Sequence, residues 1–288
     1  MTLQHAGSKD MYDTVEKIGS STIQHGPYND RIYLMKLHPE DLTTIVDQLD
    51  ELATHKGYTK IFVKVPFKLR KPFHARGYQL EAAIPGFYHG HENAEFLAKY
   101  PDEKRSIESQ PGKIQYILDL ANSKARISGN IASTPDEKGI EIIHERDVSR
   151  LAEIYRTVFE TYPFPIHEES YLLKTMRSNV DYYCIRMNDR IAAVASSEKD
   201  EAAGNVEMTD FATLPDYRGR GFALRLLERM EADMRTTGLK TTYTIARALS
   251  PGMNITFSKL GYRYGGTLTN NTNISGTIES MNIWYKSL

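Results

Sequence analysis

One stretch of the chain, residues 209–229, constrains the fold more than any other. It reads TDFATLPDYRGRGFALRLLER: an apolar strand end, a basic turn with two glycines, and then residues with helical periodicity. A strand that enters a helix through such a turn forms an anion cradle, because the turn aims backbone N–H groups at the ligand and the helix adds its positive dipole end. Gly219 and Gly221 permit close approach of the backbone. Arg218 and Arg220 add positive charge that suits phosphate oxygens.

Two common glycine-rich nucleotide loops do not fit this turn. The dinucleotide pattern G-x-G-x-x-G needs Gly or Ala where this chain has Leu224. The nucleoside-triphosphate loop needs G-K-[ST], and Phe222 and Ala223 stand there instead. What remains is R-x-x-G-x-A over residues 218–223. A surface turn with two solvated arginines is the alternative interpretation, which the preceding strand and the following helix disfavour.

Charge balance and cysteine content exclude several classes of protein. The 288 residues carry 36 basic and 37 acidic side chains, whereas a dedicated nucleic-acid-binding protein usually has a basic excess. The single cysteine, Cys184, cannot build a disulfide framework or a Cys-based zinc site. The histidines of residues 89–92 stand in a Gly-containing loop, where we expect them to be solvated and not bound to a metal. No apolar stretch reaches membrane-spanning length, so we expect a soluble, cytoplasmic protein that binds neither nucleic acid nor membrane.

The length and the segment pattern predict two domains. We expect an N-terminal arm over residues 1–29, an N-terminal α/β domain over 30–110, a connecting segment over 111–138 and a second domain over 139–288. The arm could also add a strand. The N-terminal domain should contain parallel strands at 31–37 and 60–65 around a helix at 42–55, with a further helix at 94–100.

The second domain is predicted to follow the order β-α-α-β-β-β-α-β-α-β-β. Its strands are expected at 140–143, 182–187, 190–196, 206–214, 241–246, from 262 onward and at 278–286, and its helices at 147–159, 168–177, 222–237 and 252–260. Asn188 and Asp189 between two of these strands indicate an antiparallel hairpin.

The turn motif and this order together resemble the GNAT superfamily of N-acetyltransferases, whose acetyl-CoA pyrophosphate loop is [QR]-x-x-G-x-[GA]. The resemblance implies the mixed α/β GNAT fold for residues 139–288, with an additional N-terminal α/β domain, and acetyl-CoA as co-substrate without a metal. It implies that backbone amides of Ala212, Thr213 and Leu214 meet the thioester oxygen. The pyrophosphate would be held by Arg218, Gly219, Arg220, Gly221, Phe222 and Ala223.

Two carboxylates on the strand before the turn are the candidate general bases. The resemblance favours Glu207, because histone-acetylating members carry a glutamate at the same offset, eleven residues before the first arginine of the loop. Strand alternation places Asp210 on the opposite face, which leaves it as an alternative base or an amine-binding group. Phe257 occupies the position of the family's usual acid tyrosine, and Tyr243, Tyr262 or a water could replace that acid.

The loop FETYPFP at residues 159–165 falls where the family binds its acceptor. Tyr162 and Phe164 would form a stiff wall, and Glu160 could meet a cation, although plain packing is the alternative role. Arg247, after the fifth strand, could bind a substrate carboxylate or lie on the surface.

Both domains together resemble one group within the superfamily, the β-lysine N6-acetyltransferases. The resemblance rests on GYQLEAAIPGFY at 77–88, AEF at 94–96, TYPFP at 161–165 and TDFAT at 209–213. It implies direct acetyl transfer in a ternary complex to the terminal N6 amine of β-lysine. The product would be the compatible solute Nε-acetyl-β-lysine, with a functional link to a lysine 2,3-aminomutase. A protein-lysine or other small-amine acetyltransferase, or an acetyl-CoA-sensing module without catalysis, is the alternative.

A short motif occurs twice. The pattern F-x-x-x-G-Y spans residues 73–78 and 257–262, and a β-rich apolar run comes shortly before each copy. This predicts that the N-terminal domain is a degenerate half-repeat of the GNAT fold that lacks the cofactor loop. One chain would then hold one cofactor. Coincidence is the alternative for so short a match.

Overall fold

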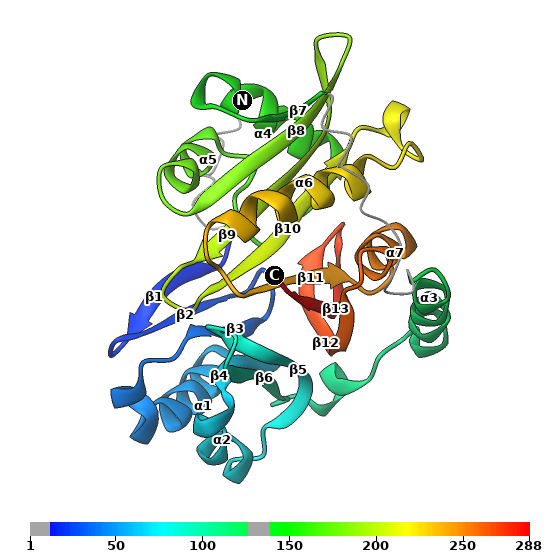
Figure 1. Cartoon of the computed structure of the whole chain (residues 1–288). Helices are drawn as coiled ribbons and strands as arrows, with labels where there is room; N and C mark the ends of the chain where they lie inside the picture. Colours follow the sequence, from blue (N-terminus) through cyan, green and yellow to red (C-terminus); the bar gives the residue numbers. More distant parts are fainter. Residues whose placement is uncertain (1–11, 126–138) are drawn as a thin grey trace, which may run out of the picture.

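The computed structural model describes residues 12–125, here termed the N-terminal half, and residues 139–288, the C-terminal half (Figure 1). Within these ranges, thirteen strands form one mixed sheet in the order β1-β2-β3-β4-β6-β5-β12-β13-β11-β10-β9-β8-β7. The N-terminal half contains β1 (Thr14–Ile18), β2 (Ser21–Gly26), β3 (Arg31–Lys36), α1 (Ile45–Lys56), β4 (Lys60–Pro66), α2 (Lys71–Ala75), β5 (Gln79–Tyr88), β6 (Glu92–Lys99) and α3 (Pro111–Ser123). The C-terminal half contains β7 (Ile140–Ile142), α4 (Val148–Val158), α5 (Glu169–Met176), β8 (Val180–Met187), β9 (Arg190–Asp200), β10 (Asn205–Thr213), α6 (Phe222–Thr236), β11 (Thr241–Arg247), α7 (Pro251–Lys259), β12 (Arg263–Ile274) and β13 (Thr277–Ser287).

The C-terminal half carries helices on both faces of its part of the sheet. Its element order confirms the predicted succession of strands and helices. Alternate side chains of β8 point to opposite faces, so Tyr182 joins a core with Leu151 of α4, while Tyr183 joins a core with Leu226 of α6. No helix of the described ranges is long and apolar enough to cross a membrane.

The N-terminal half confirms some predicted elements and corrects others. β3 and β4 are parallel, as expected, and α1 connects them. The segment predicted as an arm supplies the strands β1 and β2, which is the alternative considered for it. The helix predicted at 94–100 is wrong: these residues belong to β6, which pairs with β4 on one side and β5 on the other. Its Ala, Glu and Leu favour a helix locally, and pairing on both edges overrides that preference.

The two halves share one connectivity. The segment β3-α1-β4-α2-β5-β6 gives the strand order β3-β4-β6-β5, and β10-α6-β11-α7-β12-β13 gives β10-β11-β13-β12. Within each set the first pair is parallel and the next two pairs are antiparallel. This agreement supports the hypothesis of a second, degenerate copy.

Both copies of the F-x-x-x-G-Y motif end a helix in the same way. The amide of Tyr78 donates to the carbonyl of Phe73 at 3.2 Å, and the amide of Tyr262 donates to that of Phe257 at 3.2 Å. In each copy the two rings meet edge to face, with centroids 5.5 Å and 5.0 Å apart. The glycine between them has a φ of 83° in the first copy and 81° in the second, a conformation that glycine adopts without strain.

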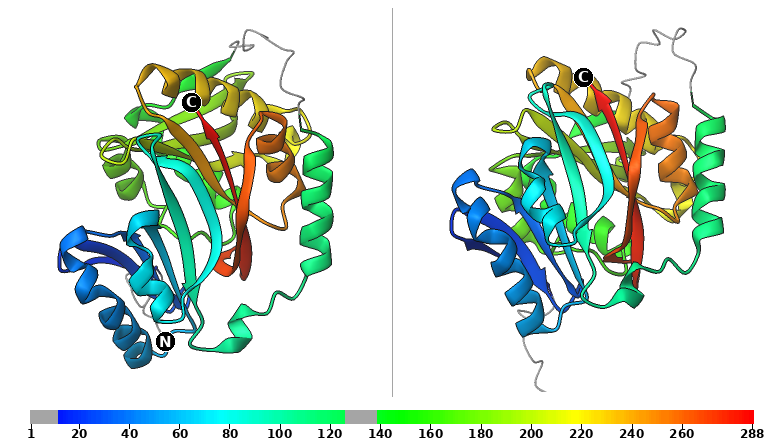
Figure 2. Two further views of the ribbon diagram at one scale, coloured as in Figure 1. Left: turned by 60° about the horizontal axis from the view of Figure 1, so that its bottom comes forward. Right: turned by 90° about the horizontal axis from the view of Figure 1, so that it is seen from below.

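The halves join at the centre of the sheet, where β5 pairs antiparallel with β12. The end of β5 also contacts the C-terminal half: Asn205 Nδ2 donates to the carbonyl of Phe87, and Thr241 Oγ1 to that of Gly86. Helix α3, the beginning of the predicted connecting segment, packs beside α7 (Figure 2), and Ser258 Oγ donates to the carbonyl of Ala121 at 2.7 Å. The rest of that segment, from residue 126, lies outside the described residues.

Candidate active site

The basic turn between β10 and α6 lines a surface cavity of about 570 Å³. Gly219 and Gly221 have φ angles of 77° and 75°. The first helical hydrogen bond runs from the Arg225 amide to the Gly221 carbonyl at 3.2 Å, so the amides of the first turn stay available to an anion. All residues from 218 to 223 line the cavity, and this arrangement fits the pyrophosphate of a coenzyme A thioester.

Strands β10 and β11 pair only where they begin. The pairing joins residues 205–207 to residues 241–243, after which the strands separate and leave a gap. Three amides were predicted to face a thioester there, but the Leu214 amide donates to a carbonyl of β9 at 3.0 Å. Bonding alternates along an antiparallel ladder, so Ala212 also faces β9 and the Thr213 amide points into the gap. Of the three predicted donors, Thr213 is therefore the one whose amide faces the gap.

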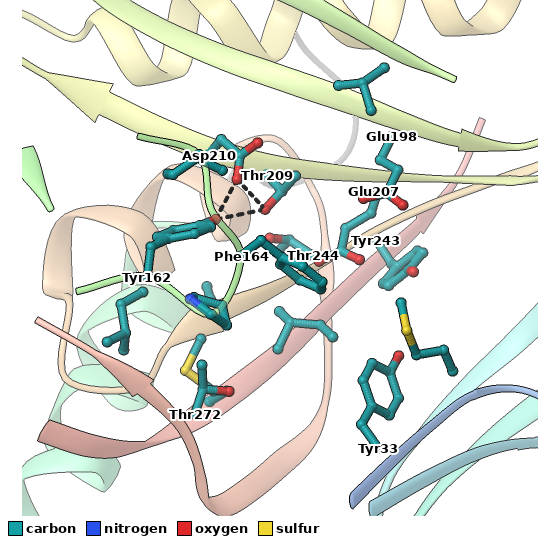
Figure 3. A pocket seen from close by; sticks show the side chains of 18 of the residues that line it. Tyr33, Tyr162, Phe164, Glu198, Glu207, Thr209, Asp210, Tyr243, Thr244 and Thr272 are labelled. Atoms are coloured by element: carbon teal, nitrogen blue, oxygen red, sulfur yellow. Dashed lines mark hydrogen bonds between the residues drawn. The ribbon is translucent and has the colours of Figure 1, made fainter. Parts of the chain in front are cut away.

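A second pocket, of about 200 Å³, lies between the two halves of the chain. Strands β3 and β4 supply one wall, strands β9, β10 and β11 supply the other, and the loop after α4 and parts of β12 and β13 also line it (Figure 3). Its lining shares Phe159, Phe211, Arg247 and Met253 with the cavity at the basic turn. The two spaces adjoin, which suits transfer of a group between two bound molecules.

Three side chains stand next to one another on neighbouring strands of this pocket, and we name them the carboxylate row. Glu207 on β10 lies directly opposite Glu198 on β9 and is paired on its other side with Tyr243 on β11. Strand pairing places Tyr243 beside Glu207, and its hydroxyl lowers the pKa of the Glu207 carboxylate.

The carboxylate row gives Glu207 an acidity suited to base catalysis at neutral pH. Burial raises the pKa of Glu207 to about 7, and the charge of Glu198 adds to that rise. The Lys64 ammonium and the neighbouring Tyr243 hydroxyl limit the increase in this pKa. The Lys64 Nζ lies 5.8 Å from the centroid of the Tyr243 ring.

Asp210 lines the same pocket, which corrects a prediction. Regular alternation along β10 would place it on the face opposite Glu207. A β-bulge between residues 209 and 212 shifts the register, and Asp210 has a φ of 55°. Its carboxylate accepts hydrogen bonds from Ser196 Oγ at 2.6 Å and from the Tyr162 hydroxyl (Figure 3). These bonds engage both oxygens, so Glu207 is the less encumbered base.

The wall from the N-terminal half carries positive charge. Alternation along β3 directs Arg31 and Tyr33 toward the pocket, and alternation along β4 does the same for Phe62 and Lys64. Burial lowers the pKa of Arg31 to about 10, so its guanidinium stays cationic at neutral pH. The pocket is thus acidic on the wall of the C-terminal half and basic on the opposite wall.

The predicted substrate-binding residues come together only in part. Tyr162 and Phe164 line the pocket. Arg247 reaches it too, but its guanidinium donates two hydrogen bonds to the Glu279 carboxylate, at 2.6 Å and 3.0 Å, and this carboxylate already balances its charge. Glu160 is exposed and lines neither of the two cavities, so the structure does not support its predicted role.

The position of the family's acid tyrosine is closed to substrate. Phe257 is fully buried and packs against Phe211 and Tyr262. The Tyr262 hydroxyl shares a hydrogen bond with Thr242 Oγ1 and lies outside both cavities. Of the two tyrosines considered as replacements, Tyr243 reaches the pocket.

Sequence reasoning missed Glu198, Arg31 and Lys64. Arg31 and Lys64 stand on the pocket-facing positions of apolar strands, and that period-two placement was a usable signal. The position of Glu198 beside Glu207 could be predicted only from the register of β9 against β10, which the sequence does not specify. Among the described residues, no cluster of His, Cys, Asp or Glu could hold a metal ion.

Comparisons with known proteins cover both halves. A family model described as the acetyltransferase (GNAT) family matches residues 149–262. The β-lysine N(6)-acetyltransferase of Methanococcus maripaludis is 40% identical over 275 residues, which is 95% of this chain and 98% of that protein. The enzyme of the same name from Methanosarcina mazei is 31% identical over 85% of this chain and 97% of that protein. The N-acetyltransferase YodP of Bacillus subtilis is 30% identical over 93% of this chain and 96% of that protein.

Proposed function

The chain belongs to the GNAT acetyltransferase family, and from this premise we propose that it acetylates the terminal N6 amine of β-lysine, with acetyl-CoA as donor. Two relatives that are named for this activity, 40% and 31% identical to the chain, support the choice of substrate. The observation that carries the proposal is the pocket between the halves, where acidic and basic walls face each other beside the cofactor cavity. β-Lysine has two amines and one carboxylate, so it requires partners of both signs.

Glu207 is the proposed general base. Its carboxylate accepts a proton from the N6 ammonium, which frees the nitrogen lone pair to attack the acetyl carbonyl. A pKa of about 7 leaves a large fraction of Glu207 ionised at neutral pH and still basic enough to take the proton. The new C–N bond forms and the C–S bond breaks. The attacking nitrogen loses its second proton to the departing sulfur, which leaves as the thiol, and the proton on Glu207 returns to solvent.

The backbone around β10 is proposed to hold the donor. Acetyl-CoA, when bound, supplies the activated acetyl group. The Thr213 amide would donate to the thioester oxygen, and the turn at residues 218–223 would hold the pyrophosphate. Asp210, fixed by Ser196 and Tyr162, would add negative potential that favours the ammonium of the substrate.

The size of the pocket argues against a protein substrate. Its volume is about 200 Å³ and both halves of the chain line it, which suits a free amino acid better than a lysine on a protein surface. We propose that the product, Nε-acetyl-β-lysine, is a compatible solute made in the cytoplasm. A lysine 2,3-aminomutase would supply the β-lysine.

The test is to identify the product. The purified chain, acetyl-CoA and β-lysine should release coenzyme A thiol, measured with a thiol reagent. NMR of the product should place the acetyl group on N6 and leave the amine on carbon 3 free. Acetylation of the carbon-3 amine, or no thiol release above the rate without amine, would contradict the proposal.

A further inference from the structure

Two residues that contact each other in the pocket between the halves, Arg31 and Asn271, each carry a buried polar side-chain atom without a hydrogen-bond partner among the described residues. Arg31 on β3 is 4% exposed and Asn271 on β12 is 1% exposed, and both line the pocket. Within the described part of the chain, neither Arg31 Nε nor Asn271 Oδ1 has a hydrogen-bond partner. Buried polar atoms are rarely left unpaired, because they lose their hydrogen bonds to water and no hydrogen bond within the protein compensates for that cost in free energy.

Contacts with the C-terminal half hold the Arg31 guanidinium in place. Its Nη1 donates to the Asn271 carbonyl and, at 3.1 Å, to Thr272 Oγ1. Its central carbon lies 5.5 Å from the ring centroid of Tyr33 and 5.7 Å from that of Phe62. Among the described residues, no carboxylate pairs with Arg31 within 4.0 Å.

Two other buried cations of the N-terminal half are already satisfied. Lys60 donates to both oxygens of Glu81, at 3.2 Å and 2.9 Å. Arg105 donates to Asp30 at 3.2 Å and to three further oxygens. Arg31 differs from these two cations because it lines the pocket and has no carboxylate within 4.0 Å among the described residues.

Resting on the proposed function, we propose that Arg31 binds the carboxylate of the substrate and that Asn271 Oδ1 accepts a hydrogen bond from the adjacent carbon-3 ammonium. β-Lysine carries these two groups at one end and the N6 amine at the other. In Figure 3, Thr272, which neighbours Asn271 and bonds Arg31, lies on the side of the pocket away from Glu198 and Glu207. The substrate then spans the pocket with N6 at the carboxylate row. The half without a cofactor loop contributes the specificity residue Arg31.

Truncated substrates test each contact separately. 1,4-Diaminopentane is β-lysine without its carboxylate, and 6-aminohexanoate is β-lysine without its carbon-3 amine. In the wild type, each should have a kcat/KM at least about 10-fold below that of β-lysine, since hydrogen bonds to charged groups are lost. In Arg31→Met, the ratio of kcat/KM for β-lysine to kcat/KM for 1,4-diaminopentane should fall by about 10- to 100-fold. The corresponding ratio for β-lysine against 6-aminohexanoate should change less. Asn271→Leu should show the reverse pattern.

The measured quantity is a ratio of two kcat/KM values on one preparation, so partial misfolding does not alter it. Arg105→Met is the matched control: it removes a guanidinium of the same half whose side chain is 9% exposed and does not line the pocket, and it should leave both ratios unchanged. Equal loss on all three substrates in Arg31→Met would overturn the proposal. A wild type without preference for the carboxylated amine would also overturn it, whatever the variants do.

Failure of the Arg31 assignment can be distinguished from failure of the proposed function. If another amino acid proves better than β-lysine, the same comparison is made between that substrate and its decarboxylated form. Loss of discrimination in Arg31→Met would then support the assignment of Arg31 while the substrate changes.

Discussion

The neighbours of Glu207 decide when it can act as a base. Because its pKa is about 7, kcat/KM for β-lysine should rise with pH through this value as the carboxylate ionises. Glu207→Gln should lower kcat by about 100- to 1,000-fold and abolish this limb of the profile, with little change in the KM for acetyl-CoA. Glu153→Gln, on an exposed face of α4, is the control. Wild-type turnover in the Glu207 variant would remove this residue as the base.

The raised pKa of Glu207 also links stability to pH. The folded chain binds this proton with a pKa of about 7 and the unfolded chain with the ordinary 4.5, so the stabilising contribution is complete below pH 4.5 and is lost as pH rises through 7. Glutamine does not ionise, so the Glu207→Gln variant does not lose this stability as pH rises. Between pH 5 and pH 8, the free energy of unfolding of the variant should therefore rise by about 1–2 kcal/mol relative to that of the wild type. This value is discounted for partial solvent exposure of the Glu207 side chain. Urea unfolding at both pH values measures the difference, and a constant offset would contradict the assigned pKa.

Single residues could be predicted from the sequence where a local motif specified them. Glu207 and the glycines of the turn stand at fixed offsets within one motif. Asp210 was placed on the wrong face because a bulge breaks the period of two, and no local pattern marks that bulge. Arg31 belongs to the pocket through a pairing between β5 and β12, which are far apart in the sequence.

The turn before α6 requires glycine for its backbone angles. Gly221→Ala should cost about 1–2 kcal/mol of strain at a φ of 75° and raise the KM for acetyl-CoA by about 10-fold. Gly238, at the other end of α6, has a φ of 85° and equally open surroundings. Gly238→Ala should therefore lose similar stability without a change in this KM. Equal KM values for acetyl-CoA in the two variants would contradict a role of this turn in cofactor binding.

Close approach of β5 and β12 requires glycine in β12, most severely at Gly266. A Cβ at Gly266 would lie 2.2 Å from the carbonyl oxygen of Glu81 and 2.6 Å from the Cα of Ala82, and φ there is 138°. Gly266→Ala should cost more than about 3 kcal/mol and lower Tm by about 5–10 °C, because backbone must move. Gly252→Ala, on an open face of α7, should change Tm little. Similar melting curves for the two variants, measured by circular dichroism, would contradict the importance of this junction.

Elements were predictable where their period was strong. The helices α4 and α6 and the succession of strands and helices along the C-terminal half follow from apolar spacing and from the turns between them. The strand β6 was not predictable, since residues 94–99 favour a helix until two neighbouring strands pair with them. Long-range pairing carries that information, and local sequence does not.

At the scale of the whole molecule, the same connectivity of four strands and two helices occurs in both halves, and the two copies differ in what they contribute to the site. The C-terminal half holds the basic turn and the carboxylate row. In the N-terminal half the equivalent segment between β3 and α1 carries Asp41, whose carboxylate accepts the amides of Ser20 and Ser21 at 3.0 Å and 2.7 Å. An acidic side chain there opposes phosphate binding, so we expect one acetyl-CoA per chain. The N-terminal half instead closes the pocket and makes it basic.

The central claim is that this pocket selects β-lysine, and a competition experiment tests it most directly. β-Lysine and α-lysine at equal concentration share one tube with the purified chain and limiting acetyl-CoA, and chromatography separates the two N6-acetylated products. Initial product ratios give the ratio of the two kcat/KM values. The account predicts at least about 10-fold more acetyl-β-lysine, because moving the amine by one carbon misplaces it against its partner. Equal amounts, or an excess of acetyl-α-lysine, would contradict it.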